Sequence, residues 1–462
     1  MRARSGSLCT SAKKCWRSSA LALAAGAALL LLGSATSAQE QGADPNAPAL
    51  RLFRIIPIDG TAGNPATRMF SFDISFWDPT SGLYVLGDRS NAALDIVDTT
   101  GKFTGTPDTL YGQIGANPGF TPGFAGDTGT TATSGPNGVA IAPNIPCIFA
   151  GDSPSRVVSF NYSVSFTTAV SAVSTGGLFR ADEMAFDPKD NLLFVVNNAD
   201  TPPYGTLIKV SSSCALSPLK YVIFTGANGI NATNGAEQPV WDPTTNMFYI
   251  SIPEINGPGG GGPNGGVAGI TTSGAIATFF PINFCQPSGL ALGPNDDLLV
   301  QCTNVFDATG KVCTTVVPGS QSKPVGVPAT CTGIARPQVV VCNPSRGCTG
   351  PSLVSVSGPG GGDEAWFNPG DGNYYITAGN NPVGPSFAVV ASVVNTFNQQ
   401  VPTLPPVPQL TPGKPPSAGT VHSIAASAQS NHVYVPLPAN TDYTDSLNNN
   451  CTQGCIAVFS AQ

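Results

Sequence analysis

Short apolar segments alternate with polar turns along the sequence from residue 49 onward. In the clearest example, Glu237 precedes the apolar segment 239–241, which is followed by an Asp-Pro turn at 242–243 and a second apolar segment, 247–250. Proline sets φ at the first turn position, and an aspartate before it can accept hydrogen bonds from the turn backbone. The pattern predicts two short antiparallel strands joined by a tight turn.

The same pattern recurs seven times, at a spacing of roughly 60 residues. The repeats open near Asp73, Asn137, Asp182, Glu237, Ser288, Asp363 and Ser423. The first divides into segments 74–77, 82–87 and 92–98 with a weaker strand from Lys102, and the third into 184–186, 192–196, 206–210 and 219–224. Four short antiparallel strands per repeat are typical of a propeller blade. We therefore predict an all-β fold, a seven-bladed β-propeller, with six blades as the alternative.

The last repeat shows fewer strands than the others, because only 433–436 and 455–459 follow its opening. The apolar segment 49–58 can supply the missing outer strand. Such pairing would close the ring through backbone hydrogen bonds and leave no open sheet edge. The alternative is that 49–58 forms a loose N-terminal extension.

The first 38 residues have the features of a signal peptide. Basic residues at 2, 4, 13, 14 and 17 precede the apolar run 20–32, and small residues lead to a cleavage site after Ala38. An uncleaved membrane anchor is the alternative, although the run is short for a bilayer core. We expect a signal peptide (1–38), a flexible leader (39–48) and one propeller domain (49–462), secreted or periplasmic, with no membrane span after signal removal.

The charge of the chain restricts its partners. Residues 1–38 carry five basic and no acidic residues, so their removal would take the formal net charge from −7 to −12. An acidic protein is a poor partner for nucleic acid and for anionic membrane surfaces. The charge is compatible with a cation or a neutral ligand, and we expect a monomer.

Cysteines give a second indication of export. Two of the 12 cysteines lie in the signal peptide, and an even number remains, which in an exported chain predicts disulfides. The strand assignment pairs Cys451 with Cys455, Cys342 with Cys348 and Cys285 with Cys302; Cys313 and Cys331 share one insertion, and Cys147 and Cys214 remain. Thiolate metal sites are the alternative, but no pair of Cys-x-x-Cys motifs is present.

Most extra sequence is predicted to lie on one face of the propeller. In a four-stranded meander, the connections after strand two and after strand four emerge on the same side, and the long insertions fall in these two places. They are Gly115–Gly135, Asn197–Gly205, Glu254–Gly266, Thr303–Pro337 and Asn440–Gly454. Loops grouped on a rigid scaffold commonly carry binding. We call this side the loop-rich face.

Polar residues enter the first strand of each blade, where the chain comes closest to the central axis. The predicted channel-lining residues are Asp73, Asn137, Asp182, Glu183, Glu237, Ser288, Asp363, Glu364 and His422. Converging carboxylate and amide oxygens would suit a hard divalent cation such as Ca²⁺. The alternative is that these polar side chains only solvate a wet channel. Asn137, Glu183, Glu237 and Asp363 are the candidate metal ligands, and we expect no other cofactor.

Two motifs resemble a known family. The segment Gly235–Tyr249 resembles the opening motif of the senescence marker protein/gluconolactonase-like (regucalcin-like) propellers, which hydrolyse lactones or esters, and 135–140 resembles their asparagine motif. The resemblance implies that Glu237 and Asn137 are metal ligands. Ser288 stands where the family has a third ligand, an aspartate, and the two motifs occur in reversed order. The repeats as a whole also resemble the seven-bladed YVTN-type propellers, which mostly bind rather than catalyse.

Two functions follow from these patterns. The first is an exported propeller that binds a small ligand or an envelope partner through the loop-rich face and the central channel. The alternative is a metal-dependent (Ca-type) lactone or ester hydrolase, in which the cation would polarise the carbonyl and activate a water. In that case His422 is the candidate catalytic base.

Overall fold

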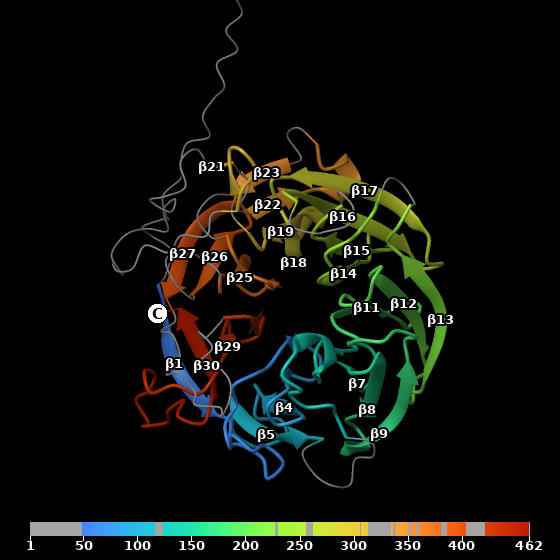
Figure 1. Cartoon of the computed structure of the whole chain (residues 1–462). Helices are drawn as coiled ribbons and strands as arrows, with labels where there is room; N and C mark the ends of the chain where they lie inside the picture. The colour runs from blue at the N-terminus through green and yellow to red at the C-terminus, as the bar shows by residue number, and fades with distance from the viewer. Residues whose placement is uncertain are drawn as a thin grey trace, which may run out of the picture. The chain divides into compact units, whose positions relative to one another are not determined.

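The computed structural model describes residues 49–115, 123–226, 230–255, 262–304, 306–312, 334–335, 339–349, 353–356, 360–379, 386–402 and 421–461. These residues belong to one compact unit and form seven four-stranded antiparallel sheets, arranged as the blades of a propeller (Figure 1). The predicted all-β, seven-bladed fold is confirmed, and the six-bladed alternative is wrong. The predicted signal peptide and leader lie outside the described residues.

In six blades the strands follow one another in sequence order. Blades 1 to 3 comprise β2 (Ser75–Asp78), β3 (Leu83–Asp88), β4 (Ala93–Asp98), β5 (Thr109–Ile114); β6 (Val139–Ile141), β7 (Cys147–Asp152), β8 (Arg156–Asn161), β9 (Ser165–Ser174); and β10 (Met184–Asp187), β11 (Leu192–Asn197), β12 (Tyr204–Val210), β13 (Leu216–Ile223). Blades 4 to 6 comprise β14 (Pro239–Asp242), β15 (Met247–Ile252), β16 (Asn264–Thr271), β17 (Ile276–Asn283); β18 (Pro287–Leu292), β19 (Leu298–Cys302), β22 (Val339–Cys342), β23 (Leu353–Val356); and β24 (Ala365–Asn368), β25 (Asn373–Thr377), β26 (Ser386–Ala391), β27 (Thr396–Pro402).

Small elements outside the blades are few in the described chain. A two-stranded sheet, β20 (Phe306–Asp307) with β21 (Ile334–Ala335), lies within the β19–β22 connection. Three short 3₁₀ helices are η1 (Thr131–Thr133), η3 (Pro294–Asp296) and η4 (Pro344–Arg346). Among the described residues, no helix is long and apolar enough to cross a membrane.

The seventh blade closes the ring in the predicted way. Its strands are β28 (Ala425–Ala426), β29 (Val433–Leu437), β30 (Cys455–Ala461) and β1 (Leu50–Pro57), with β1 outermost and antiparallel to β30. In Figure 1, β1 in blue lies beside β30 in red. Ile55 and Ile56 of β1 are buried. The alternative of a loose N-terminal extension is therefore wrong.

One strand prediction needs correction. The outer strand of blade 1 begins at Thr109 and not near Lys102. The residues in between form a turn because the Asp98 carboxylate accepts hydrogen bonds from the backbone N–H groups of Gly101 at 2.9 Å and Thr104 at 2.8 Å. A carboxylate that binds several N–H groups competes with strand pairing for the same donors.

The four disulfides of the described residues match the predicted pairs. They join Cys147 to Cys214, Cys285 to Cys302, Cys342 to Cys348 and Cys451 to Cys455. Cys313 and Cys331 lie outside the described residues.

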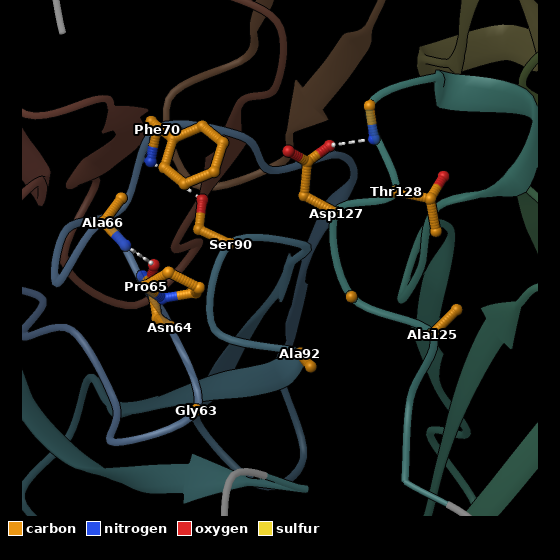
Figure 2. A pocket seen from close by; sticks show the side chains of 12 residues that line it. Gly63, Asn64, Pro65, Ala66, Phe70, Ser90, Ala92, Ala125, Asp127 and Thr128 are labelled. Atoms are coloured by element: carbon orange, nitrogen blue, oxygen red, sulfur yellow. Dashed lines mark hydrogen bonds between the residues drawn. The ribbon is translucent and has the colours of Figure 1, made fainter. Parts of the chain in front are cut away.

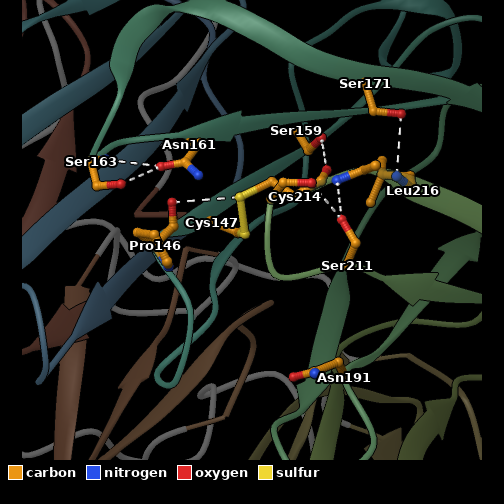
Figure 3. The surroundings of a disulfide bond; sticks show 12 residues. Pro146, Cys147, Ser159, Asn161, Ser163, Ser171, Asn191, Ser211, Cys214 and Leu216 are labelled. Carbon is orange, nitrogen blue, oxygen red and sulfur yellow. Dashed lines mark hydrogen bonds between the residues drawn. A yellow bond between two sulfur atoms is a disulfide. The ribbon is translucent and has the colours of Figure 1, made fainter.

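The Cys147–Cys214 disulfide links two blades. Cys147 begins β7 in blade 2, and Cys214 lies between β12 and β13 in blade 3. Figure 3 shows the bridge among short polar contacts, including the hydrogen bond that Ser159 Oγ donates to Cys214 O at 2.6 Å. Both cysteines are fully buried. The bridge therefore fixes blade 3 against blade 2 on the face opposite the long loops.

Removal of this bridge should destabilise the protein more than removal of a local one. The two cysteines of Cys147–Cys214 are 67 residues apart, against 4 for Cys451–Cys455. In the loop-closure treatment, which is model-dependent, the longer loop contributes about 4 kcal/mol and the shorter about 2 kcal/mol. Chemical denaturation of C147A/C214A and, as the matched control, C451A/C455A should show the larger loss for the first pair. Equal losses would contradict this role.

Candidate functional site

The seven innermost strands place equivalent residues at one height around the axis. At one position, which precedes the inner strand in six blades and is the second residue of β18 in blade 5, the chain has Asp73, Asn137, Asp182, Glu237, Ser288, Asp363 and His422, which we call the rim layer. The following residues are Ile74, Gly138, Glu183, Gln238, Gly289, Glu364 and Ser423, which we call the second layer. The rim layer lies at the loop-rich end, since the connection from the previous blade enters there.

Two arginines, Arg89 and Arg180, bind the rim residues of blades 1 to 3. Arg89 forms an ion pair with Asp73, and its Nε donates to Asn137 Oδ1 at 2.9 Å. Arg180 bridges Asp73 and Asp182, with Nη1 at 3.3 Å from Asp73 Oδ2 and Nη2 at 2.7 Å from Asp182 Oδ2. Blades 1, 2 and 3 are therefore joined through charged side chains at the axis.

Sequence reasoning missed both arginines. Arg89 directly follows β3, and Arg180 precedes the acidic pair of blade 3 by a short distance. The sequence did offer a signal for both, because basic residues are rare in this chain. Arg89 lies close to the end of a predicted strand, and Arg180 lies close to the predicted channel residues 182 and 183. Their effect is large: burial alone would raise the pKa of Asp73, but the guanidinium groups of Arg89 and Arg180 hold it well below its usual range.

His422 lies between two rim carboxylates. Its Nε2 is 2.7 Å from Asp73 Oδ1, and its Nδ1 is 3.2 Å from Asp363 Oδ2. Burial alone would lower the pKa of His422, but the charges of Asp363 and Asp73 raise it above its ordinary value. The side chains of His422 and Asp363 keep 27% and 33% of their surface exposed, so both can meet a ligand from the loop-rich face.

Beneath the rim, two glutamates are buried in the second layer. Glu183 and Glu364 are 3% and 1% exposed. Glu364 Oε2 accepts a hydrogen bond from Ser423 Oγ at 2.9 Å, whereas Glu364 Oε1, Glu183 Oε2 and Asp182 Oδ1 accept none from the described residues. Buried polar atoms without partners are uncommon in proteins, and these three belong to carboxyls of the rim and second layers, so they can accept from a group that the described protein does not supply.

Burial, together with the mutual repulsion of the acids, raises the pKa values of several carboxyl groups in these two layers. Burial, followed by the charges of Glu237 and Glu364, raises the pKa of Glu183 well above its ordinary value. Burial and the charge of Asp363 raise the pKa of Glu237 to about 8. Burial raises the pKa of Asp182 to about 7, although Arg180 opposes the shift. The positive charges of the protein are therefore too few to neutralise this cluster.

The second layer also contains contacts that cross between blades. Gln238 of blade 4 donates from Nε2 to Ala365 O of blade 6 at 3.1 Å, and its Oε1 accepts from Leu290 N at 2.8 Å and Ala365 N at 3.0 Å. Gly289 permits this close approach, because a Cβ there would lie 2.7 Å from Ala365 N.

Further from the loop-rich face, aromatic rings continue the packing. The rings of Phe76 in blade 1 and Trp366 in blade 6 meet edge to face at 5.2 Å, in front of the alanine strand β28 of blade 7. This contact joins blades 1 and 6 on the side away from the loop-rich face. The part-exposed side chains of His422 and Asp363 indicate that a ligand would reach the acidic residues from the loop-rich face.

The candidate metal ligands are only partly brought together. Glu183, Glu237 and Asp363 interact electrostatically. The Asn137 carboxamide, in contrast, is engaged: besides binding Arg89, its Nδ2 donates to Ser134 O at 2.9 Å. Ser288 donates its hydroxyl hydrogen to Gly362 O at 2.9 Å. Within the part of the chain that the structure describes, no three His, Cys, Asp or Glu side chains are grouped to hold a metal ion. The metal site stays a prediction.

A pocket of about 510 Å³ is lined in part by Ser90, the residue that follows Arg89 of the channel. Figure 2 shows its two sides, with Phe70, Ser90 and Ala92 facing Ala125 and Asp127. Ser90 Oγ is occupied by the backbone of residues 70 and 71, so the hydroxyl is part of the pocket wall. The pocket brings the insertion between blades 1 and 2 into the surroundings of the channel.

Comparisons with known proteins identify the fold and not the family. No family model matches the sequence, and no curated protein matches it. Among solved structures, hydrazine synthase from Kuenenia stuttgartiensis is similar with a TM-score of 0.54 and 10% sequence identity, over 83% of this chain and 94% of that chain. At this identity the similarity shows the propeller fold alone. The resemblance to gluconolactonase-like and YVTN-type propellers stays a prediction.

The raised pKa of Glu237 gives a test by pH. A carboxyl whose pKa is higher in the folded than in the unfolded state favours folding most at low pH, and this contribution is lost as the pH rises from about 4.5 to about 8. Glu237→Gln removes the titration. Its melting temperature relative to that of the wild type should therefore increase between pH 4.5 and pH 8.5. The exposed Asp442→Asn is the matched control; the same trend in both variants would argue against the assignment.

Proposed function

We propose that the protein is an exported β-propeller that binds a small ligand at the loop-rich end of its central channel. The observation that carries the proposal is the group of buried, unpartnered carboxylate oxygens on Asp182, Glu183 and Glu364. Burial of carboxylates without partners costs free energy. The fold itself does not require acids there, because Gly138 and Gly289 occupy the second layer in blades 2 and 5. A bound ligand would offset that cost.

Export is supported by the disulfides. Four bridges occur among the described residues, and such bridges persist in secreted and periplasmic proteins, where thiols are not kept reduced. The predicted signal peptide points the same way. The long connections on the loop-rich face would surround the ligand or an envelope partner, as loops on rigid scaffolds commonly do.

Ligand binding can be tested by thermal melting of the purified protein with calcium chloride, spermidine, glucose and citrate in turn. A ligand that binds only the folded state at 100 times its dissociation constant adds about 2.7 kcal/mol of stability. We expect at least one positively charged or neutral compound to raise the melting temperature, and citrate not to. The shift should disappear in Glu237→Gln/Asp363→Asn and persist in Asp190→Asn, a change in the exposed β10–β11 turn on the opposite face. Equal shifts in all variants would place binding elsewhere.

A metal-dependent lactone or ester hydrolase is the second candidate, and one observation favours it. His422 is held between Asp73 and Asp363, the geometry of an imidazole base oriented by a carboxylate. A divalent cation held by Glu183, Glu237 and Asp363 would polarise a substrate carbonyl. With Asp363 turned to the cation, Nδ1 of the part-exposed His422 ring would be free to take the proton from the attacking water, while Asp73 holds Nε2.

The hydrolase is tested by activity on a γ-lactone and on an aryl ester, with calcium chloride and after EDTA treatment. General-base catalysis contributes typically 10²–10⁴-fold, so His422→Asn should lower kcat by about that factor and leave KM nearly unchanged. His432→Asn, which changes the other histidine, is the control. Hydrolysis that is absent with calcium, or equal in both variants, would reject this candidate.

A further inference from the structure

We infer, on the basis of the proposed binding function, that the ligand presents a terminal organic ammonium group to the acidic end of the channel. The group would lie among Glu237, Asp363 and the two buried second-layer glutamates. The inference follows from which acceptors are free, where they lie and what can approach them.

The donors of the protein are already used on one side of the channel. Arg89 binds Asp73 and Asn137, and Arg180 binds Asp73, Asp182 and, through Nε, Asn198 Oδ1 at 3.1 Å. These two arginines therefore supply the positive charge that pairs with the rim carboxylates of blades 1 and 3.

The other side has an excess of acceptors. Asp363 and Glu364 of blade 6 and Glu237 of blade 4 have no lysine or arginine within ion-pair distance among the described residues. A bound cation favours the ionised form of carboxyls whose pKa burial has raised, and an ionised carboxylate can only accept hydrogen bonds. The complementary ligand group must therefore supply several donors and a positive charge.

The unpartnered oxygens lie on different blades. Glu183 Oε2 belongs to blade 3 and Glu364 Oε1 to blade 6, and these two blades are separated by two others on the shorter way around the ring. Both glutamates occupy the second-layer position directly before the innermost strands of their blades, β10 and β24. Acceptors that surround a space from several directions suit a group whose donors diverge, as the three N–H bonds of an ammonium do.

Carboxylate oxygens that lie on different blades are less suitable as ligands of one metal ion. Calcium takes six to eight oxygens at 2.3–2.6 Å, which requires the ligands to converge closely. The described residues contain no such group, and Asn137 is turned to Arg89. Hydrogen bonds to an ammonium span about 2.7–3.2 Å and tolerate wider spacing.

Access to the site limits the shape of the ligand. Asp363 is a third exposed, whereas Glu364 directly beneath it is 1% exposed. Phe76 and Trp366 occupy the inner side further down. A slender chain that ends in an ammonium would enter from the loop-rich face and place only its charged end among the carboxylates, because the deeper ones are almost fully buried.

The test is isothermal titration of the purified full protein with 1,5-diaminopentane, 1,5-pentanediol and calcium chloride. We expect saturable binding of the diamine with one site per chain, and none of the diol, which has the same length without the charge. Asp363→Asn and Glu364→Gln should each weaken diamine binding by roughly tenfold or more, because each removes a charged hydrogen-bond partner. Asp190→Asn, a change at an exposed aspartate in the β10–β11 turn on the opposite face, should leave it unaltered.

Other outcomes separate the inference from the proposed function. If calcium binds, with a dependence on Asp363 and Glu364, and the diamine does not, the ammonium inference is wrong and the channel remains a binding site. If the diol binds as well as the diamine, the ammonium inference is also wrong. Diamine binding that is equal in all variants would reject both, since the contact would then be general attraction to an acidic surface. Melting curves show whether each variant is folded at the temperature of titration.

Discussion

The pairing of β1 with β30 is the interaction on which the rest of the structure depends. Residues 50–57 complete the blade that residues 455–461 belong to, so the two ends of the described chain are joined by backbone hydrogen bonds. Closure removes the free sheet edges that an open array of blades would leave. It also places blade 7 beside blade 1, which brings His422 to Asp73 and Ser423 to Ser75. The candidate site therefore exists only in the closed ring.

The ring is regular in its backbone and irregular in its charges. Each blade contributes one rim residue and one second-layer residue, yet acids, amides, glycines and one histidine alternate at these positions. Arg89 and Arg180 pair with Asp73 and Asp182, whereas Glu183 of blade 3 and the acids of blades 4 and 6 have no such partner among the described residues. The repeated strands form the scaffold, and the rim and second-layer residues that differ between blades determine what the channel can bind.

Propellers support many unrelated functions, so the fold says little about this one. The structural similarity to hydrazine synthase, at 10% identity, shows the fold alone. The chemical argument therefore rests on this chain alone: buried carboxylates are tolerated only where protons, cations or donors compensate them. A site of this kind combines the low hydration of a protein interior with access from one face.

The sequence by itself determined the number of blades, most strand positions and the closing strand, because each depends on local periodicity repeated along the chain. Three of the four described disulfides followed from cysteines that the strand assignment brings close together, and Cys147–Cys214 followed by elimination. The sequence also identified the rim residues, since they occur where the chain enters each inner strand. Only the tertiary structure decided how these residues share their partners. Arg89 and Arg180 lie outside the repeat motif, and Asn137 turns toward Arg89 rather than toward Glu237. Such contacts join residues far apart in sequence, and their geometry depends on how closely seven strands approach one axis.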